Sequence, residues 1–248
     1  MKIVQITDLH VADEGVGTNG VDVRQNFQAV LKTTRSLAPD LIVLTGDLCY
    51  DVGEERTYRW IRSHLDFLKI PYTAIGGNHD SSSMLAKAFH IDHLLVGNEL
   101  FYRRELEGWN VLFLETSVGE LSEKQLLWLE IELSKIGRDA VIFMHHPPII
   151  SGVPFMDNKH ALRNMAEVQA VLFNFPHHLS IFCGHYHVEK VVCQRNLTVH
   201  ITPSVFFQID WHAEGFKVDH HRIGLREINL RNDGVVESTV IYQQGHKK

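Results

Sequence analysis

The sequence has few of the features that mark secreted or membrane proteins. It holds only three cysteines, Cys49, Cys183 and Cys193, and no Cys-x-x-Cys pair, so neither a disulfide framework nor a cysteine zinc site is indicated. Apolar runs such as 41–44 are far shorter than the roughly 20 residues that cross a bilayer. We therefore expect neither a membrane span nor a membrane partner.

The start of the chain also lacks the apolar core and small-residue cleavage site of a signal peptide. Instead, residues 1–4 lead at once into a polar motif. The mature protein is therefore expected to start here. Together with the few cysteines, this predicts a protein of the reducing cytoplasm.

Positive charge is in the minority. Lys and Arg total 24 against 30 Asp and Glu, which gives a net charge of −6. Proteins that grip a phosphate backbone usually present a basic face, so no extended nucleic acid is expected as a partner. No stretch rich in Pro, Gly and Ser divides the chain, and residues 1–248 are expected to form a single domain.

Short β-branched segments alternate with helical patterns through the first two thirds of the chain. Residues 2–7 are the first predicted strand, apolar positions between 23 and 37 predict a helix, and residues 41–44 predict the next strand. A second helical pattern over 58–68 leads into a predicted strand at 72–75. Such alternation is typical of an α/β protein.

Further along the chain the pattern shifts toward β-structure. Ser122–Gln125 matches a capping box and opens a predicted helix, which is followed by a predicted strand at 141–144. Hairpins are predicted around the turns at 107–108 and 232–234. The C-terminal third is therefore expected to be mostly β.

Histidine is abundant, with 17 residues among 248, and imidazole is both a common metal ligand and a near-neutral acid or base. Several histidines stand directly after predicted strands. Five strand ends carry polar motifs: Asp8-Leu9-His10, Gly46-Asp47, Gly77-Asn78-His79-Asp80, His145-His146 and Gly184-His185-Tyr186-His187. Because the carboxyl ends of strands in an open α/β sheet form the ligand crevice, these residues are expected to converge.

The expected set mixes nitrogen and oxygen ligands, which suits Zn, Mn or Fe better than Ca. It has seven candidate ligands: Asp8, His10, Asp47, Asn78, His145, His185 and His187. This is too many for one ion, but it fits two divalent ions bridged by Asp47, about 3.5–4 Å apart as in two-metal hydrolases. Asp-x-His and Gly-Asp alone are weak, since Gly-Asp is most often a turn, whereas Gly-His-x-His is moderately specific and Gly-Asn-His-Asp is stronger. The interpretation depends on all five, and five unrelated polar turns are the alternative.

In this order the motifs resemble the calcineurin-like metallophosphoesterase superfamily, over residues 8–187. The resemblance implies a four-layer α/β/β/α sandwich with the metals at the edge where the strands end. It implies two ligand sets: Asp8, His10, Asp47 and His187 for one ion, and Asp47, Asn78, His145 and His185 for the other. The chain departs from the family at Gly76-Gly77, where a Pro is frequent, and this leaves the ligands intact.

A finer resemblance, in chain size and in segments 46–48, 121–129 and 145–148, is to the class III cyclic nucleotide phosphodiesterases. It implies hydrolysis of small phosphodiesters, with 3′,5′-cyclic AMP converted to AMP, and a homodimer. A protein phosphatase is disfavoured, because Gly-Asn-His-Asp stands where Gly-Asn-His-Glu would be expected. A glycerophosphodiester or nucleotide-lipid phosphodiesterase and a non-catalytic metal-binding module remain open.

The expected mechanism is in-line attack on phosphorus by a hydroxide that bridges the two ions. The leaving alkoxide needs a proton, and His79 adjoins the ligand Asn78 without being needed as a ligand. We expect His79 to be that acid, oriented by Asp80. The alternative is that His79 only binds the phosphate, beside Asn78. His146 is expected to support the metal site or contact the substrate.

Two later regions could overhang the site. One holds Phe155 and Met156, and the other holds Trp211 and His212. An aromatic side chain there could stack on a base, although packing within a loop or the core is the competing explanation.

Overall fold

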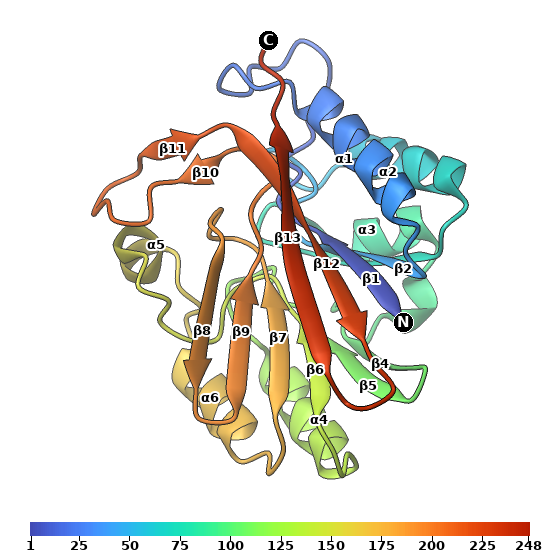
Figure 1. The fold of residues 1–248 in the computed structure, drawn as a ribbon, viewed down its shortest axis with the longest axis vertical. Helices are drawn as coiled ribbons and strands as arrows, with labels where there is room; N and C mark the ends of the chain where they lie inside the picture. Colours follow the sequence, from blue (N-terminus) through green and yellow to red (C-terminus); the bar gives the residue numbers. More distant parts are fainter.

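The first of two β-sheets has five strands in the computed structural model, which describes residues 1–248. In spatial order they are β13 (Val236–Gln244), β12 (Arg222–Leu230), β1 (Lys2–Ile6), β2 (Leu41–Thr45) and β3 (Tyr72–Ile75). β1, β2 and β3 are parallel, and β12 and β13 pair antiparallel at one side. The helices of this half are α1 (Val23–Leu37), α2 (Glu55–Leu68) and α3 (Ser82–Phe89), as Figure 1 shows. A short 3-10 turn, η1 (Asp92–Leu94), follows α3.

The second sheet has six strands. In spatial order they are β4 (Tyr102–Leu106), β5 (Trp109–Phe113), β6 (Ala140–Phe143), β7 (Leu179–Cys183), β9 (Leu197–Ile201) and β8 (Lys190–Gln194). The four inner strands are parallel and the two edge strands are antiparallel to their neighbours. This half also contains α4 (Glu123–Ser134), α5 (Pro154–Lys159), α6 (Met165–Phe173) and a small hairpin of β10 (Gln208–Ile209) and β11 (Val218–His220).

Helix boundaries follow from local capping. Asp22 caps α1 by accepting a hydrogen bond of 3.0 Å from the backbone N–H of Gln25. Ser122 caps α4 in the same way. The side chain of Gln125 does not complete the expected capping box. Its amide instead bonds the backbone N–H and C=O of Glu115, at 2.8 and 2.9 Å, and so fixes α4 to the loop after β5.

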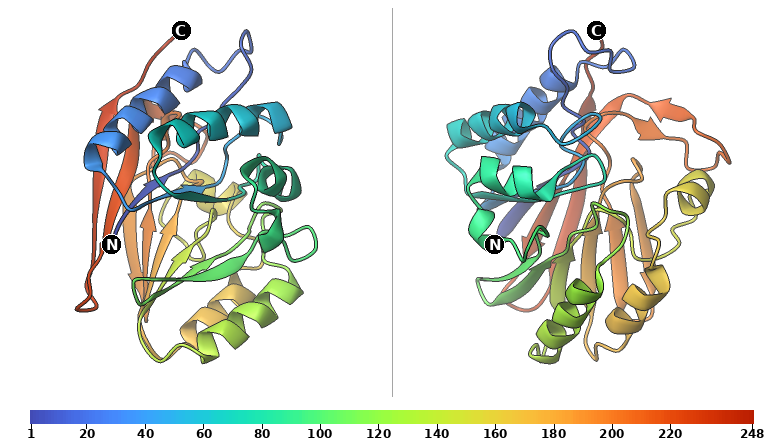
Figure 2. Two further views of the ribbon diagram at one scale, coloured as in Figure 1. Left: turned by 90° about the vertical axis from the view of Figure 1, so that its right-hand side faces the viewer. Right: turned by 180° about the vertical axis from the view of Figure 1, so that it is seen from behind.

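Both faces of the second sheet are buried. Phe113, Phe143 and Phe182, on adjacent strands, stack in a row with ring centroids 5.4 and 5.5 Å apart and belong to the core shared with the first sheet. Leu112 and Ile142, on the opposite face, belong to the core beneath α4 and α6. Figure 2 (left) shows the two groups of helices on opposite sides of the sheets. The predicted four-layer α/β/β/α sandwich is confirmed.

The parallel strands of both sheets end at one edge of the sandwich, where their loops bond to one another. The N–H of Asp8 donates to the carbonyl of Gly46, and the N–H of Gly184 donates to the carbonyl of His145, each at 3.0 Å. A bond of 3.2 Å from Val205 to Thr7 joins the two halves. None of the helices combines the length and apolar character needed to cross a membrane.

Candidate functional site

The five polar motifs meet at this edge, after β1, β2, β3, β6 and β7. The ligand atoms form two groups, and within each group they all lie within 4.8 Å of one another: Asp8, His10 and His187 in one, and Asp47, His145 and His185 in the other. A third group of His10, Asp47 and His79 overlaps both. Asn78 lines the same cavity as Asp47 and His185. All seven candidate ligands therefore come from separate parts of the chain to one place.

The two carboxylates stand between facing imidazole rings. The Nε2 atom of His145 is 3.2 Å from Oδ2 of Asp47. The Nε2 atom of His187 is 3.4 Å from Oδ1 of Asp8 and 3.1 Å from Nε2 of His10. Carboxylate oxygens and imidazole nitrogens thus crowd a buried space that offers them few hydrogen-bond donors.

Backbone carbonyls orient three of the histidine rings. His145 donates from Nδ1 to the carbonyl of Thr45 at 2.8 Å, and His187 donates from Nδ1 to the carbonyl of Phe207 at 3.0 Å. The Nε2 atom of His185 contacts the carbonyl of His160 at 2.9 Å. A proton held on these nitrogens leaves the lone pair of the opposite nitrogen for the centre of the site.

One atom tests whether a cation fits these residues. The Nε2 atom of His145 is buried and has no hydrogen-bond partner, an arrangement that costs free energy unless something pairs with the nitrogen. It faces the carboxylate of Asp47. A divalent cation between them would satisfy both groups, so the donor set fits a metal.

The backbone is strained at most of these positions. Five of the seven candidate ligands have left-handed φ angles: Asp8 (54°), His10 (46°), Asp47 (50°), His185 (66°) and His187 (50°). Such angles cost a non-glycine residue about 1–3 kcal/mol each and persist where the surrounding structure enforces them, often at functional sites. This strain lowers the stability of the fold, and it accompanies the inward direction of these side chains.

Two glycines allow the loops to approach this closely. A Cβ atom on Gly184 would lie 2.6 Å from Oδ2 of Asp8 and would collide with Thr7. A Cβ atom on Gly77 would collide with the backbone nitrogen and the carboxylate of Asp47. The absence of a side chain at these two glycines therefore permits the close approach of the loops.

Burial and mutual charge set the protonation of the site. Burial would raise the pKa values of Asp8 and Asp47, but the facing imidazoles outweigh it and hold both below the usual range. Burial lowers the pKa values of His10 and His185 to about 3. Burial would lower the pKa of His145, but the charges of Asp47 and Asp8 outweigh it and raise that pKa to about 9, so a metal ion bound there would displace the proton. Ionised carboxylates and neutral imidazoles are the forms that bind metal ions.

A sequence model of the calcineurin-like phosphoesterase family matches residues 1–189, which contain all five motifs. The chain belongs to the calcineurin-like phosphoesterase family. Members are metal-dependent hydrolases, and the two clusters of Asp and His provide the candidate ligands for two ions.

Curated relatives carry the same kind of name. The chain is 37% identical over 210 residues to a Fibrobacter succinogenes protein named "Probable cyclic nucleotide phosphodiesterase", covering 85% of this chain and 82% of the relative. It is 32% identical over 249 residues to the 3′,5′-cyclic adenosine monophosphate phosphodiesterase CpdA of Escherichia coli K12, covering 97% and 89%. An Arcobacter nitrofigilis relative named "Probable glycerophosphodiester phosphodiesterase GpdQ" is 30% identical, covering 75% and 72%.

Solved structures agree with the fold. A dimetal phosphatase from Danio rerio superposes with a TM-score of 0.70 at 15% identity, covering 97% of this chain and 98% of that one. A purple acid phosphatase from yellow lupin superposes with a TM-score of 0.66 at 15% identity, covering 98% of this chain and 54% of that one. At this identity the likeness concerns the fold alone.

His79 lies beside the metal ligands with its ring held by an unexpected partner. Its Nδ1 atom contacts the carbonyl of Asp51 at 2.9 Å, its backbone N–H donates to Asp47 at 2.9 Å, and its ring meets that of His10 edge-on at 4.9 Å. The expected orientation by Asp80 is not what the structure has. The Asp51 carbonyl performs that task, because the Asp80 side chain is engaged elsewhere.

Asp80 fastens two loops together. Its carboxylate accepts hydrogen bonds from the backbone N–H of Gly77 at 2.9 Å and of Leu48 at 3.1 Å, and from the hydroxyl of Tyr58 at 3.0 Å. Burial and the neighbouring charge of Asp47 raise the pKa of Asp80 to about 6. Asp80 therefore positions the loops after β2 and β3.

His146 is behind the metal ligands. Its Nδ1 atom is 2.8 Å from the hydroxyl of Thr116, and its ring packs 4.0 Å from the ring of His185. It is buried and is not among the residues that line the cavity. The structure thus places His146 against the candidate ligand His185, which fits the expected support of the metal site.

The site opens into a cavity of about 420 Å³ with two kinds of wall. One wall holds candidate ligands and His79. The other is mainly aromatic and apolar: Tyr50, Phe155, Met156, Phe206, Phe207, Ile209 and Phe216. Phe155 and Met156 do overhang the site. Trp211 and His212 do not line the cavity, and the aromatic side chain that their hairpin presents there is Phe216.

Sequence reasoning missed several of these residues. Phe206 and Phe207 lie in the loop after β9, and an aromatic pair in a loop that follows a strand was a usable signal. His160, which was not among the candidate site residues, also lines the cavity. Nothing local distinguishes it, because its contribution is the carbonyl that orients His185.

Proposed function

We propose that this protein is a dimetal phosphodiesterase that hydrolyses 3′,5′-cyclic AMP to AMP. The observation that carries the proposal is the pair of buried Asp and His clusters facing one cavity. Relatives named as cyclic nucleotide phosphodiesterases, aligned over 85% and 97% of the chain, support the substrate class.

The proposed ligand sets follow the two clusters, with Asp47 shared. Asp8, His10, Asp47 and His187 would hold one ion, and Asp47, Asn78, His145 and His185 would hold the other. The mixed nitrogen and oxygen donors suit Fe, Mn or Zn. When bound, the ions supply an activated water and neutralise charge on the phosphate.

The protein's own charges leave the centre attractive to phosphate. Only two carboxylates, Asp8 and Asp47, face the two sites, so they offset only half the charge of two divalent ions. The net positive charge that remains draws in the phosphate oxygens. Asn78, exposed in the cavity wall, is positioned to donate a hydrogen bond to one of them.

We assign the general acid to His79. Its Nδ1–H donates to the carbonyl of Asp51, so Nε2 remains to meet the substrate. In the protonated ring, the Nε2 proton passes to the ribose oxygen as its bond to phosphorus breaks, while the Nδ1–H bond is kept. A poor leaving group such as a ribose alkoxide needs this proton far more than a phenolate does.

The test measures initial rates of Mn-loaded protein on cyclic AMP, glycerophosphoethanolamine and p-nitrophenyl phosphate. We expect cyclic AMP to be the best substrate and the monoester the worst. Turnover of glycerophosphoethanolamine without turnover of cyclic AMP would keep the dimetal chemistry and replace the substrate. No turnover of any of the three would count against the proposal.

A matched pair of variants controls this experiment. Asn78→Ala removes a cavity residue, whereas Asn98→Ala removes an exposed amide in the turn before β4. Only the first should lose activity and bound metal, the latter measured by elemental mass spectrometry. Equal behaviour of the two variants would contradict the assigned site.

A further inference from the structure

The cavity has an aromatic half that the metal chemistry does not use. Its rings form a continuous wall that begins at the ligands, where Phe206 lies 5.1 Å from the ring of His10. Phe206 packs 4.2 Å from Phe207, which lies 5.9 Å from Phe216. Phe216 in turn lies 5.9 Å from Phe155 of α5. The wall therefore leads from the metal ligands to the rim.

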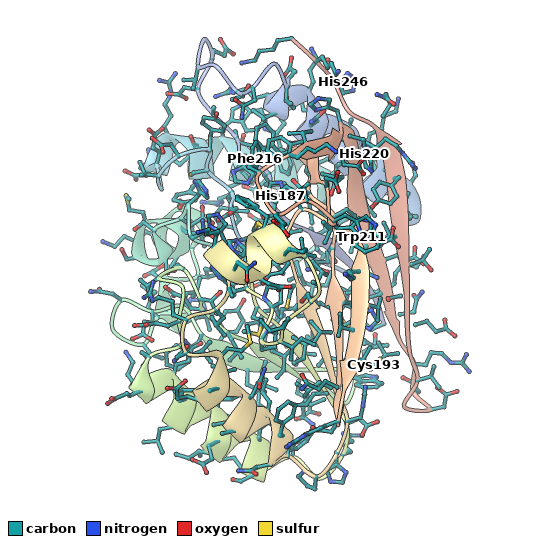
Figure 3. All side chains as sticks on the ribbon, turned by 90° about the vertical axis from the view of Figure 1, so that its left-hand side faces the viewer. His187, Cys193, Trp211, Phe216, His220 and His246 are labelled. Carbon is teal, nitrogen blue, oxygen red and sulfur yellow. The ribbon has the colours of Figure 1, made fainter.

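Phe216 is exposed at this rim. Its side chain is 57% exposed, although it belongs to the row of rings that lines the cavity. Figure 3 shows it beside His187, above the short helix α5. Its neighbours Phe206 and Phe207 are buried members of the core, whereas Phe216 is not part of it. An exposed large aromatic side chain in a cavity wall is typical of a surface that a ligand covers.

The loop that carries Phe216 is closed by specific contacts. Lys217 forms an ion pair of 2.7 Å with Asp210, and the backbone N–H of Asp210 donates to the carbonyl of Lys217 at 2.8 Å. Lys190 spans from this hairpin to the segment before α5. Its Nζ donates to the carbonyl of Gly152 at 2.8 Å and stands over the ring of Trp211 at 4.7 Å. The position of Phe216 opposite Phe155 is therefore held from both sides.

We propose that the aromatic wall of Phe155, Phe207 and Phe216 binds the nucleobase of the substrate and selects nucleotides over other diesters. This rests on the proposed function, because it names the part of the site that chooses among phosphodiesters. With the phosphate at the ligands, the organic part of the substrate extends along the cavity. A base has a π-face that stacks on aromatic rings, whereas glycerol and ethanolamine have none.

The experiment compares Phe216→Ala and Phe155→Ala with Phe67→Ala, which removes an exposed ring of α2 that is 77% exposed. We expect the first two to lower kcat/KM for cyclic AMP about ten- to hundred-fold, mainly through KM, as lost base stacking predicts. Rates on glycerophosphoethanolamine should stay within about two-fold. Phe216→Trp should keep the cyclic AMP activity, and Phe67→Ala should match wild type.

Binding supplies a readout that does not require turnover. Calorimetry with Mn-loaded protein would compare AMP with inorganic phosphate, since only AMP carries a base. We expect AMP to bind more tightly than phosphate, and Phe216→Ala to remove most of that difference while leaving phosphate affinity unchanged.

The outcomes separate the two proposals. If wild type hydrolyses cyclic AMP and the Phe variants are unchanged, or lose both diesters equally, the wall does not select the base. If wild type fails on cyclic AMP but cleaves glycerophosphoethanolamine, the proposed function is wrong, and the calorimetry still decides the inference. AMP binding no tighter than phosphate would overturn it.

Discussion

The two walls of the cavity are built in opposite ways. Side chains of the metal wall such as Asp47 and His187 are buried, follow strands of the central sheets, and lie where the family model matches residues 1–189. The aromatic wall draws mainly on residues beyond that match, and its rim residue Phe216 is exposed on a short hairpin. The difference indicates that the reaction chemistry and the choice of substrate reside in separable parts of the chain.

The largest effect should come from Asp47→Asn, because Asp47 belongs to both proposed ligand sets and to two of the three clusters of close ligand atoms. Loss of its charge should remove at least one ion and lower kcat/KM on the order of a thousand-fold, for cyclic AMP and for a glycerol diester alike. Metal content and initial rates on both substrates check this. Glu130→Gln, an exposed carboxylate of α4, is the control. A loss of activity confined to cyclic AMP would contradict the conclusion that the reaction chemistry and the choice of substrate reside in separate walls.

His79→Ala should reduce turnover of cyclic AMP about a hundred-fold, within the usual range for general acids. Metal content should be preserved, since each proposed ion keeps four other protein ligands. The decisive measurement is the dependence on leaving group, using a p-nitrophenyl diester beside cyclic AMP. Equal slowing of both would mean that His79 binds the phosphate and does not donate a proton.

Tyr186 links the two walls, and its loss should lower stability. Its hydroxyl donates to Asp157 of α5 at 2.9 Å, from between the ligands His185 and His187. Tyr186→Phe should decrease the free energy of unfolding by about 1.5 kcal/mol, since hydrogen bonds to a charged group contribute about 1.5–3 kcal/mol. Urea denaturation at saturating Mn²⁺ measures this.

Tyr72→Phe is the matched control for this link. Its hydroxyl bonds Asp66 at the surface, and an exposed pair contributes little. If the two variants lose equal stability, the Tyr186 bond does not hold the walls together.

The metal wall was readable from sequence because each ligand directly follows a strand of marked apolar character. His145 stands after 141–144, and His185 stands after 179–183. Parallel strands ending at one edge bring such residues together without further information. The order of the motifs along the chain supported the resemblance to the family, and that resemblance implied the four-layer sandwich.

The aromatic wall was harder to predict for physical reasons. Phe206, Phe207 and Phe216 resemble core residues in the sequence. The hairpin that carries Phe216 has strands too short to show the alternation of apolar and polar residues by which a strand is predicted. Trp211 was an equally suitable candidate in the sequence, but it packs against Lys190 and does not line the cavity. The partner of His79 was missed because it is a backbone carbonyl, 28 residues away in the chain.

The smallest effect should come from Lys190→Met, which keeps the length of the side chain but removes its charge. The variant loses the bond to Gly152 and the contact with Trp211, which together hold the hairpin near α5. A partly exposed cation–π contact contributes about 0.5–1 kcal/mol, so KM for cyclic AMP should rise about two- to five-fold with kcat and metal content unchanged. Arg195→Met removes a similar cation–π contact, with Phe173, and should have no effect on KM. If Lys190→Met lowered kcat on both diesters while KM stayed constant, the hairpin would act on the metal wall, and the two walls would not be separable.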